Sequence, residues 1–239
     1  MKKILSVLLL SWLPAMGMAA GGGVALDHLE IDLSDQESMR NGAKVFMTYC
    51  LNCHSAKYQR YNRMAEDIGM SLEELKPLMF ITDKVGDTMS VAIDHKQAKK
   101  WFGTLPPDLS LVARSRGPDW LYTYMRSFYR DDSRPFGVNN LVFKDVGMPH
   151  ALIDLQGLAE PVYKDETKKE ISRLEIKTAG TLTAEQYDDL VSDLVHFLVY
   201  VGEPAKLERY SLGVKVILFL VVLTILLYLV KREYWRDVR

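Results

Sequence analysis

Cysteine is scarce in this sequence: the 239 residues include only two, beside five histidines and nine prolines. A set of disulfides is therefore not available to hold its loops in place. The chain also has no internal repeat, no phosphate-binding glycine motif and no Ser/His/Asp arrangement that would indicate a hydrolase. Its formal net charge of −1 is uninformative by itself, because the charges are unevenly placed along the chain, and we expect no nucleic-acid partner. Hydrophobic residues make up 48% of the chain, enough to bury a core in one or two domains.

The first twenty residues have the three-part organisation of a secretory signal peptide. Two lysines come first, an apolar run follows over residues 4–13, and small residues occupy positions 17–20. The apolar run is too short to span a bilayer, which needs about 20 residues. We therefore predict a signal peptide over residues 1–20, followed by an exported mature chain.

A second apolar segment, residues 211–230, is long enough to cross a membrane. Twenty helical residues rise about 30 Å, the thickness of the hydrocarbon core of a bilayer. The segment has no polar face over residues 216–230, which does not fit a buried helix of a soluble core. Basic residues dominate the tail at 231–239, and the positive-inside rule places this tail in the cytoplasm. Residues 21–210 would then form a domain outside the cytoplasm.

The domain between these two ends is acidic. Its charge is more negative than that of the whole chain, because residues 215–239 hold five basic side chains against two acidic ones and the signal peptide holds two lysines. The most acidic stretch is residues 27–37. Such a surface would steer a basic partner, although ordinary solvated acidity explains it equally well.

Both cysteines stand in one short motif, Cys50-Leu51-Asn52-Cys53-His54. C-x-x-C-H is typical of c-type haem attachment, because two thioether bonds must reach the two vinyl groups of the porphyrin and the next side chain must lie under the iron. A thioredoxin-type redox pair is the alternative, but no βαβ pattern surrounds the motif. We predict one haem c bound covalently through Cys50 and Cys53, with His54 as the proximal ligand, oriented by a hydrogen bond at its other ring nitrogen.

Met148 is predicted to be the sixth ligand of the iron. It lies in VFKDVGMPH, residues 142–150, where the glycine before it allows close approach of the backbone and the proline after it stiffens the loop. His150 is the close alternative, whereas His196 stands in an amphipathic helix and is expected to be a packed histidine. Methionine at helical spacing is usually a core residue. The methionines that fit this description are Met47, Met64, Met70, Met79, Met89 and Met125.

Most of the exported domain is predicted to be helical. Residues 41–50 form a helix that leads into the cysteine motif, and capping boxes at 71–74 and 183–186 open two further helices. Residues 117–130 are expected to form a helix rich in aromatic side chains. Residues 161–180 fit either a hairpin or a mobile loop. The predicted fold class is therefore mainly α, with one transmembrane helix at the C-terminus.

Four sequence blocks together resemble a known family. They are YCLNCHSAKYQRYNR (49–63), GTLPPDLSLVARSRGPDWLYTYMRSFYRD (103–131), VFKDVGMPH (142–150) and SDLVHFLVYVGEPAKLERYSLGVKVIL (192–218). In this order, ahead of one C-terminal anchor helix, they are similar to proteobacterial cytochrome c1 over nearly the whole mature chain. C-x-x-C-H alone fits any c-type cytochrome, but the four blocks are more specific. The resemblance implies a class I-like c-type cytochrome haem domain with loop insertions.

The resemblance also implies a function in electron transfer. Members of this family are the haem c subunit of the cytochrome bc1 complex, the ubiquinol:cytochrome c oxidoreductase of the respiratory chain. Such a subunit takes one electron from the Rieske iron-sulfur protein and passes it to a cytochrome c, while quinol is oxidised on cytochrome b. The chain would therefore not be an enzyme on its own. Its domain would lie in the periplasm, anchored in the bacterial inner membrane and in contact with membrane lipid.

Further site residues follow from the resemblance. Arg116 matches an arginine that pairs with a haem propionate, a contact that suits the two-pronged guanidinium, and Arg114 is close enough to exchange with it. Pro107 and Leu109 match a segment that packs on the haem, although a plain turn and core residue explain them equally well. Some members carry an extra cysteine pair that forms a disulfide. This chain lacks the pair, so packing and the haem must hold its large loops.

Two other functions remain open at this point. A free-standing, membrane-tethered carrier would need a flexible linker ahead of its anchor, whereas residues 201–214 are short and not rich in glycine and serine. A peroxidase-like or gas-sensing haem protein would need an open sixth position on the iron. The glycine and proline on either side of Met148 do not favour that alternative.

Overall fold

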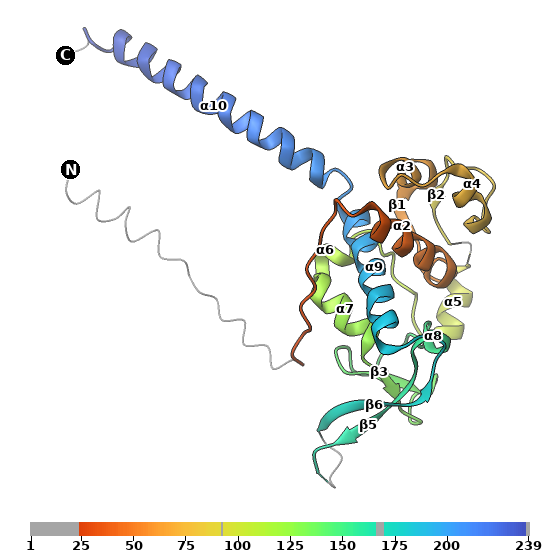
Figure 1. Ribbon diagram of the computed structural model, residues 1–239. Helices are drawn as coiled ribbons and strands as arrows, with labels where there is room; N and C mark the ends of the chain where they lie inside the picture. The colour runs from red at the N-terminus through yellow and green to blue at the C-terminus, as the bar shows by residue number, and fades with distance from the viewer. Residues whose placement is uncertain (1–23, 92, 166–169, 238–239) are drawn as a thin grey trace.

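The computed structural model describes residues 24–91, 93–165 and 170–237, so the predicted signal peptide lies outside the described residues. Figure 1 shows most helices gathered in one body, from which a long C-terminal helix and a β-hairpin project in different directions. The α-helices are α2 (Gln36–Val45), α3 (Tyr61–Asp67), α4 (Leu72–Leu75), α5 (His95–Phe102), α6 (Val112–Arg116), α7 (Pro118–Arg126), α8 (Ile153–Gln156), α9 (Ala184–Gly202) and α10 (Lys206–Tyr234). A π-helical turn, η1 (Phe46–Cys50), follows α2, and a 3-10 turn, η2 (Lys76–Leu78), follows α4.

The strands of the described residues form three separate antiparallel pairs. They are β1 (Ala56–Arg60) with β2 (Thr88–Met89), β3 (Phe128–Arg130) with β4 (Val138–Asn140), and β5 (Gly157–Tyr163) with β6 (Ile171–Ala179). These two-stranded pairs are too small to build a core of their own. The core is therefore made mainly by helices, as the mainly α prediction requires.

The centre of the body is the crossing of α2 and α9. Gly42 lets the two helices approach closely, because a Cβ at this position would lie only 2.0 Å from the carbonyl oxygen of Asp193. Ser38 Oγ donates to Asp193 Oδ1 at 2.6 Å, and the rings of Phe46 and Phe197 pack with their centroids 5.5 Å apart. Since α2 leads directly into the cysteine motif, this crossing determines where the motif begins.

Local capping signals open the helices largely as predicted. Both capping boxes form, with Ser71 ahead of α4 and Thr183 ahead of α9. The helix before the cysteines was predicted over residues 41–50 and begins earlier, because Asp35 caps it by accepting a hydrogen bond from Ser38 N. Its last turn is π-helical, a local widening that the apolar pattern of the sequence did not indicate.

The aromatic helix predicted over residues 117–130 is shorter than expected. α7 ends at Arg126, and the next residues pair with β4 as strand β3. Phe128 and Tyr129 are both buried there, on opposite faces of the strand. Asn140, opposite Phe128, donates from Nδ2 to Tyr124 O at 2.8 Å and so satisfies a carbonyl at the helix end. A run of aromatic residues fits helix or strand, so pattern alone did not mark the change.

In the segment over residues 161–180, the described residues on either side of 166–169 pair as a hairpin, one of the two predicted alternatives. β5 and β6 pair over their whole length, and the hairpin projects from the lower end of the body in Figure 1. Gly157 stands at its base with φ of 88°, where a Cβ would lie 2.1 Å from Thr178 O. Only glycine fits such a close approach in that backbone conformation.

The methionines predicted as core residues are all buried. His196 is also packed, as predicted: its Nδ1 donates to Ser192 O at 2.8 Å, and its Nε2 accepts from Asp32 N at 3.2 Å. These contacts satisfy both ring nitrogens within the protein. His196 is therefore a structural residue that joins α9 to the N-terminal segment.

Acidic residues tie the N-terminal segment to the body. Arg126 on α7 binds Asp27 at 2.6 Å and Asp188 of α9 at 2.6 Å. The amide of Leu29, two residues after Asp27, donates a hydrogen bond to Asp119 of α7 at 2.9 Å. We call residues 24–33 the N-terminal strap, because these contacts hold it along α7 and α9. At least one residue of the predicted acidic stretch, Asp27, therefore pairs with another residue of this chain and not with a partner.

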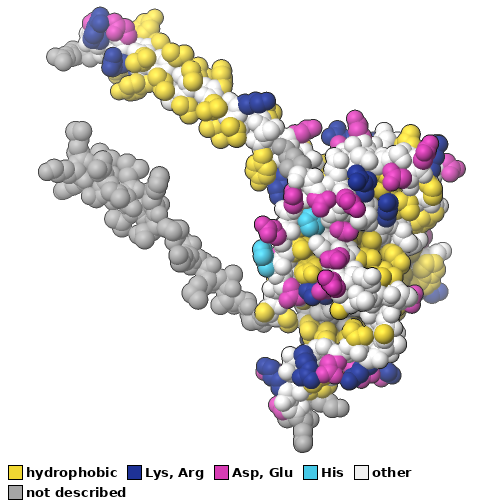
Figure 2. Space-filling view, in the orientation of Figure 1, with side chains coloured by type: hydrophobic (Ala, Val, Ile, Leu, Met, Phe, Trp, Pro, Cys, Tyr) yellow, Lys and Arg dark blue, Asp and Glu magenta, His cyan; other side chains and the backbone are white. Residues whose placement is uncertain are grey.

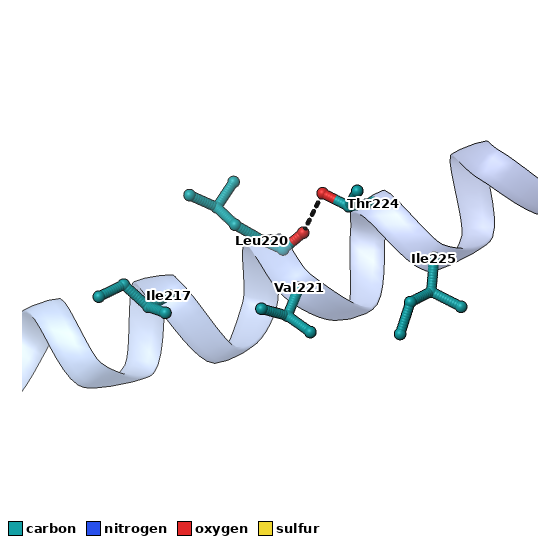
Figure 3. Close-up of a pocket in the computed structure, with 5 residues that line it drawn as sticks. All are labelled: Ile217, Leu220, Val221, Thr224 and Ile225. Atoms are coloured by element: carbon teal, nitrogen blue, oxygen red, sulfur yellow. Dashed lines mark hydrogen bonds between the residues drawn. The ribbon is translucent and has the colours of Figure 1, made fainter. Parts of the chain in front are cut away.

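α10 extends beyond the predicted span of residues 211–230 at both ends. From Glu208 to Tyr234 it is long and apolar enough to cross a membrane, with a mean hydropathy of 2.7 and no burial in its most apolar part. Figure 2 shows its apolar covering, with basic side chains near either end. Figure 3 shows the five side chains of this helix that line a pocket on its surface; among them, Thr224 Oγ1 donates back to Leu220 O at 2.7 Å and needs no outside partner. Only Glu203 to Ala205 separate α9 from α10.

Candidate functional site

The two cysteines lie where η1 delivers the chain into a tight turn. Cys50 ends η1, and the amides of Cys53 and His54 both donate to Cys50 O, at 3.0 and 2.8 Å. Cys50 is buried, Cys53 is half-buried, and neither forms a disulfide. Burial raises the pKa of the Cys50 thiol to about 12 and also raises the pKa of Cys53. Both are therefore protonated thiols at neutral pH, presented on one turn of the chain.

The His54 imidazole is held in a fixed orientation beside these thiols. Its Nδ1 lies 2.8 Å from the carbonyl oxygen of Pro107, an acceptor that requires the proton on Nδ1. Burial lowers the pKa of His54, so the ring is neutral at neutral pH. Nε2 then keeps its lone pair and takes no hydrogen bond from the described residues. This is the arrangement that a metal-ligating histidine needs.

The segment predicted to pack on the cofactor reaches the motif through its backbone. Leu109 N donates to Ser55 O at 2.7 Å, and Lys57 N donates to Asp108 Oδ2 at 3.1 Å. Leu109 packs against the core, whereas Pro107 is exposed and contributes its carbonyl rather than its ring. The structure thus brings both predicted residues to the cysteine motif, and it shows a contact of Pro107 that the sequence did not specify.

Met148 lies on the irregular loop between β4 and α8, as predicted. The hydroxyl of Tyr124, on α7, donates to the Met148 sulfur at 3.4 Å. The loop is also held at Asp145, three residues before Met148, whose amide donates to Asn139 Oδ1 at 2.8 Å and whose carbonyl accepts from Arg134 Nη2 at 2.8 Å. Asp145 has a φ of 62°, a conformation that aspartate tolerates better than most residues. The sulfur is therefore positioned by its own contact with Tyr124 and by the hydrogen bonds that hold the loop at Asp145.

His150, the alternative ligand, is packed in the core. Its ring is 4% exposed and lies parallel to Phe128, with centroids 4.8 Å apart and an interplanar angle of 3°. Neither ring nitrogen has a hydrogen-bond partner among the described residues. Burial lowers its pKa to about 4, so the ring is neutral at neutral pH.

The two candidate arginines point to different parts of the body. The Arg116 guanidinium lies over the Trp120 ring at 5.1 Å and over the Phe143 ring at 5.9 Å. The stem of Arg114 instead lies on the end of α9, with its Cγ 3.3 Å from the Cβ position of Gly202. Arg116 is thus the arginine that shares an aromatic surface with the Met148 loop.

That surface is a continuous row of rings that sequence reasoning missed. We call it the aromatic row. Trp120 stacks on Tyr124 with ring centroids 4.8 Å apart, Tyr124 meets Phe128 edge-on at 5.1 Å between centroids, and Trp120 and Phe143 meet edge-on with centroids 6.4 Å apart. Trp120 and Tyr124 are four residues apart on one helix, a spacing that places them on the same face. This spacing, next to Arg116, was the available signal.

The residues fit a covalently bound haem. Two free thiols and a fixed neutral imidazole stand on one turn, and a thioether sulfur and a guanidinium stand on the aromatic row. Large apolar side chains around the segment before Pro107 are also exposed, with Trp101 at 59% and Leu105 at 42%.

Comparison with known proteins identifies the family. The family model described as Cytochrome C1 family matches residues 30–238. A cytochrome c1 from Allochromatium vinosum is 47% identical over 243 aligned residues, with both chains covered in full. An ammonia monooxygenase gamma subunit from Nitrosomonas europaea is 46% identical over 94% of each chain, and a cytochrome c1 from Rhodospirillum rubrum is 28% identical over 86% of this chain and 83% of its own. Matched over nearly its whole length by this model, the chain belongs to the cytochrome c1 family.

Proposed function

We propose that this chain is the haem c electron-transfer subunit of a ubiquinol:cytochrome c oxidoreductase, the cytochrome bc1 complex of a respiratory chain. The observation that carries the proposal is the His54 imidazole, held by Pro107 O beside two free thiols at C-x-x-C-H spacing. Membership of the cytochrome c1 family supports it. The subunit makes and breaks no substrate bond; it positions a redox group between two partners.

Each site residue has a proposed role. Cys50 and Cys53 would hold the haem through thioether bonds, and His54, through Nε2, and Met148 would ligate its iron. Arg116 pairs with a propionate, as its place beside the aromatic row suggests. Haem supplies one-electron redox chemistry when bound. A thioether ligand and a buried site both favour the reduced iron and raise its potential.

The proposal also includes the partners of the chain and its membrane topology. The domain, residues 21–210, has a class I-like haem fold in the periplasm, follows a cleaved signal peptide and takes electrons from the Rieske protein for a cytochrome c. Residues 211–230 cross the inner membrane beside cytochrome b and lipid, and the tail at 231–239 is cytoplasmic. The short connection from α9 to α10 supports a domain held at a fixed height above the membrane, as an electron relay between set positions requires.

Purification from the native membrane in a mild detergent tests this proposal. Mass spectrometry of the co-purified proteins is expected to find cytochrome b and a Rieske protein in stoichiometric amounts. A chain found alone, monodisperse and with its haem intact, would contradict the complex and favour the tethered carrier. Subunits of an ammonia monooxygenase in their place would favour the second candidate, an electron carrier within that assembly. The similarity to a protein of that name is the reason to consider it.

The haem peroxidase or gas-sensor alternative has its own test. The reduced wild-type protein is expected not to bind carbon monoxide, because Met148 occupies the sixth position in the proposed site. Visible spectra before and after carbon monoxide addition measure this directly. A shifted Soret band in the wild type would favour an open or displaceable sixth position.

A further inference from the structure

A pocket lies where the body meets the anchor helix. It has a volume of about 200 Å³ and is formed by the N-terminal strap, α6, the start of α7, the end of α9 and the start of α10, elements that Figure 1 shows near the base of α10. The site proposed for the haem does not use it. One part of its wall is apolar and the other is charged. The apolar residues include Ile31, Pro118 and Val199, and the charged residues are Arg114, Glu203 and Lys206.

The charge of this pocket is positive, although the domain as a whole is acidic. Glu203 is already paired, since Arg209 Nη2 lies 2.8 Å from its carboxylate. Asp32, next to the pocket residue Ile31, accepts hydrogen bonds from Ser34 instead. Arg114 and Lys206 make no ion pair with any residue in the part of the chain that the structure describes. Two cations therefore face the pocket without a compensating carboxylate.

Arg114 is directed to this place by the end of α9. Gly202 has no side chain, and the Arg114 Cγ lies 3.3 Å from the point where a Cβ would stand. The apolar stem of Arg114 therefore rests on the backbone of α9, and its guanidinium is exposed. This contact explains why Arg114 and Arg116, two residues apart, serve different surfaces.

The position of the pocket along α10 indicates which kind of ligand it can bind. Lys206 begins α10, and the apolar segment over residues 211–230 begins five residues later. Five helical residues rise about 7.5 Å, so Lys206 stands at the level of the lipid headgroups when residues 211–230 fill the hydrocarbon core. A phosphodiester with its glycerol and upper acyl chain has the chemistry that fits: an anion for the two cations and an apolar portion for the apolar wall.

We propose that this pocket binds the phosphate of an anionic phospholipid, held by Arg114 and Lys206, in the leaflet next to the haem domain. The site rests on the proposed membrane placement of α10. It would fix the base of the haem domain against the membrane surface, in addition to the covalent connection through residues 203–205. The bound lipid would be a part of the folded subunit and not one of the bulk lipids of the surrounding bilayer.

The test uses the haem-loaded full-length chain, purified with the subunits that accompany it, in nanodiscs of equimolar phosphatidylglycerol and phosphatidylcholine. Native mass spectrometry after mild detergent release counts the lipids retained per chain. The wild type is expected to retain one phosphatidylglycerol in preference to phosphatidylcholine. The variant Arg114→Gln/Lys206→Gln is expected to lose this preference, by about fivefold for each cation removed. The variant Lys231→Gln/Arg232→Gln, with the same charge change at the other end of α10, is expected to keep it.

Four outcomes would overturn the site. Equal retention of the two lipids by the wild type, or equal loss of preference in both variants, would show only general attraction at the membrane surface. Displacement of phosphatidylglycerol by millimolar inorganic phosphate, with phosphate itself bound, would make it a site for a free anion. A chain that does not enter the discs would overturn the membrane placement in the proposed function as well, which separates the two failures. The visible spectrum of the haem confirms that each variant is folded.

Discussion

At the scale of single residues, the Met148 sulfur is the atom on which the proposed redox site depends most. Its loop is held by Asn139 and Arg134 at Asp145 and by Tyr124 at the sulfur itself. The two thiols and His54, by contrast, belong to one turn with its own hydrogen bonds. Loss of the sulfur should therefore change the ligation and the potential of the iron without releasing the haem.

Met148→Leu tests this separation. Leucine has a similar volume, so we expect a loss of stability below about 1.5 kcal/mol and a haem that stays covalently attached. The potential is expected to fall, and the reduced protein is expected to bind carbon monoxide. Redox titration and visible spectra measure both changes. Met64→Leu, at a fully buried methionine away from the loop, is the control and should change neither. An unchanged potential in Met148→Leu would rule Met148 out as the ligand.

Tyr124→Phe tests the hydrogen bond to the sulfur. The hydroxyl withdraws electron density from the sulfur and makes it a weaker donor to ferric iron, so its removal should lower the potential. The loss of stability should be about 0.5–1.5 kcal/mol. Tyr187→Phe is the matched control, because its buried hydroxyl donates at 2.8 Å to a backbone carbonyl, Met125 O. Equal potentials in the two variants would mean that the Tyr124 hydroxyl does not act on the ligand.

At the scale of elements, the crossing of α2 and α9 carries the site. The cysteine motif continues directly from α2, and α9 presents Phe197 against Phe46, the first residue of η1. The distance between the helices depends on the missing side chain at Gly42.

Gly42→Ala is expected to destabilise the protein, although alanine is the better helix former by about 1 kcal/mol. The added carbon would meet Asp193 O at 2.0 Å, which forces the two backbones apart and costs about 1–3 kcal/mol net. Thermal unfolding should show a Tm lower by about 4–10 °C. Gly86→Ala is the control, since no atom lies within 4 Å of its Cβ position. A Tm unchanged or raised by Gly42→Ala would show that the crossing adapts.

At the scale of the whole molecule, α10 and the body are joined by three residues but share little surface. The most apolar part of α10 has no burial against the body, and the strap is tied to α7 through Arg126 and to α9 through His196. The body should therefore fold without its anchor.

Truncation after Ala205 tests that independence. We expect a soluble exported domain with the same haem spectrum and the same potential as the full chain. Gel filtration and redox titration measure these properties. Co-purification with the membrane partners should be lost, because the domain no longer stands at a fixed height. A truncated chain that loses its haem or aggregates would show that α10 contributes to the core.

The sequence by itself determined the features that depend on spacing and local chemistry. Cysteines three residues apart with a histidine next, a loop methionine between glycine and proline, two capping boxes and an apolar run long enough for a bilayer all act through near neighbours along the chain. Helix type, caps and the family resemblance followed from them.

Only the tertiary structure decided which distant groups meet. Pro107 O at the His54 imidazole, the Tyr124 hydroxyl at the Met148 sulfur and the separation of Arg114 from Arg116 each depend on how helices cross and loops return. The change from helix to strand at Phe128 has the same origin, because pairing with β4 outweighs a local preference that is nearly balanced. Contacts between residues far apart in the chain have no period or spacing to mark them, so packing alone selects them.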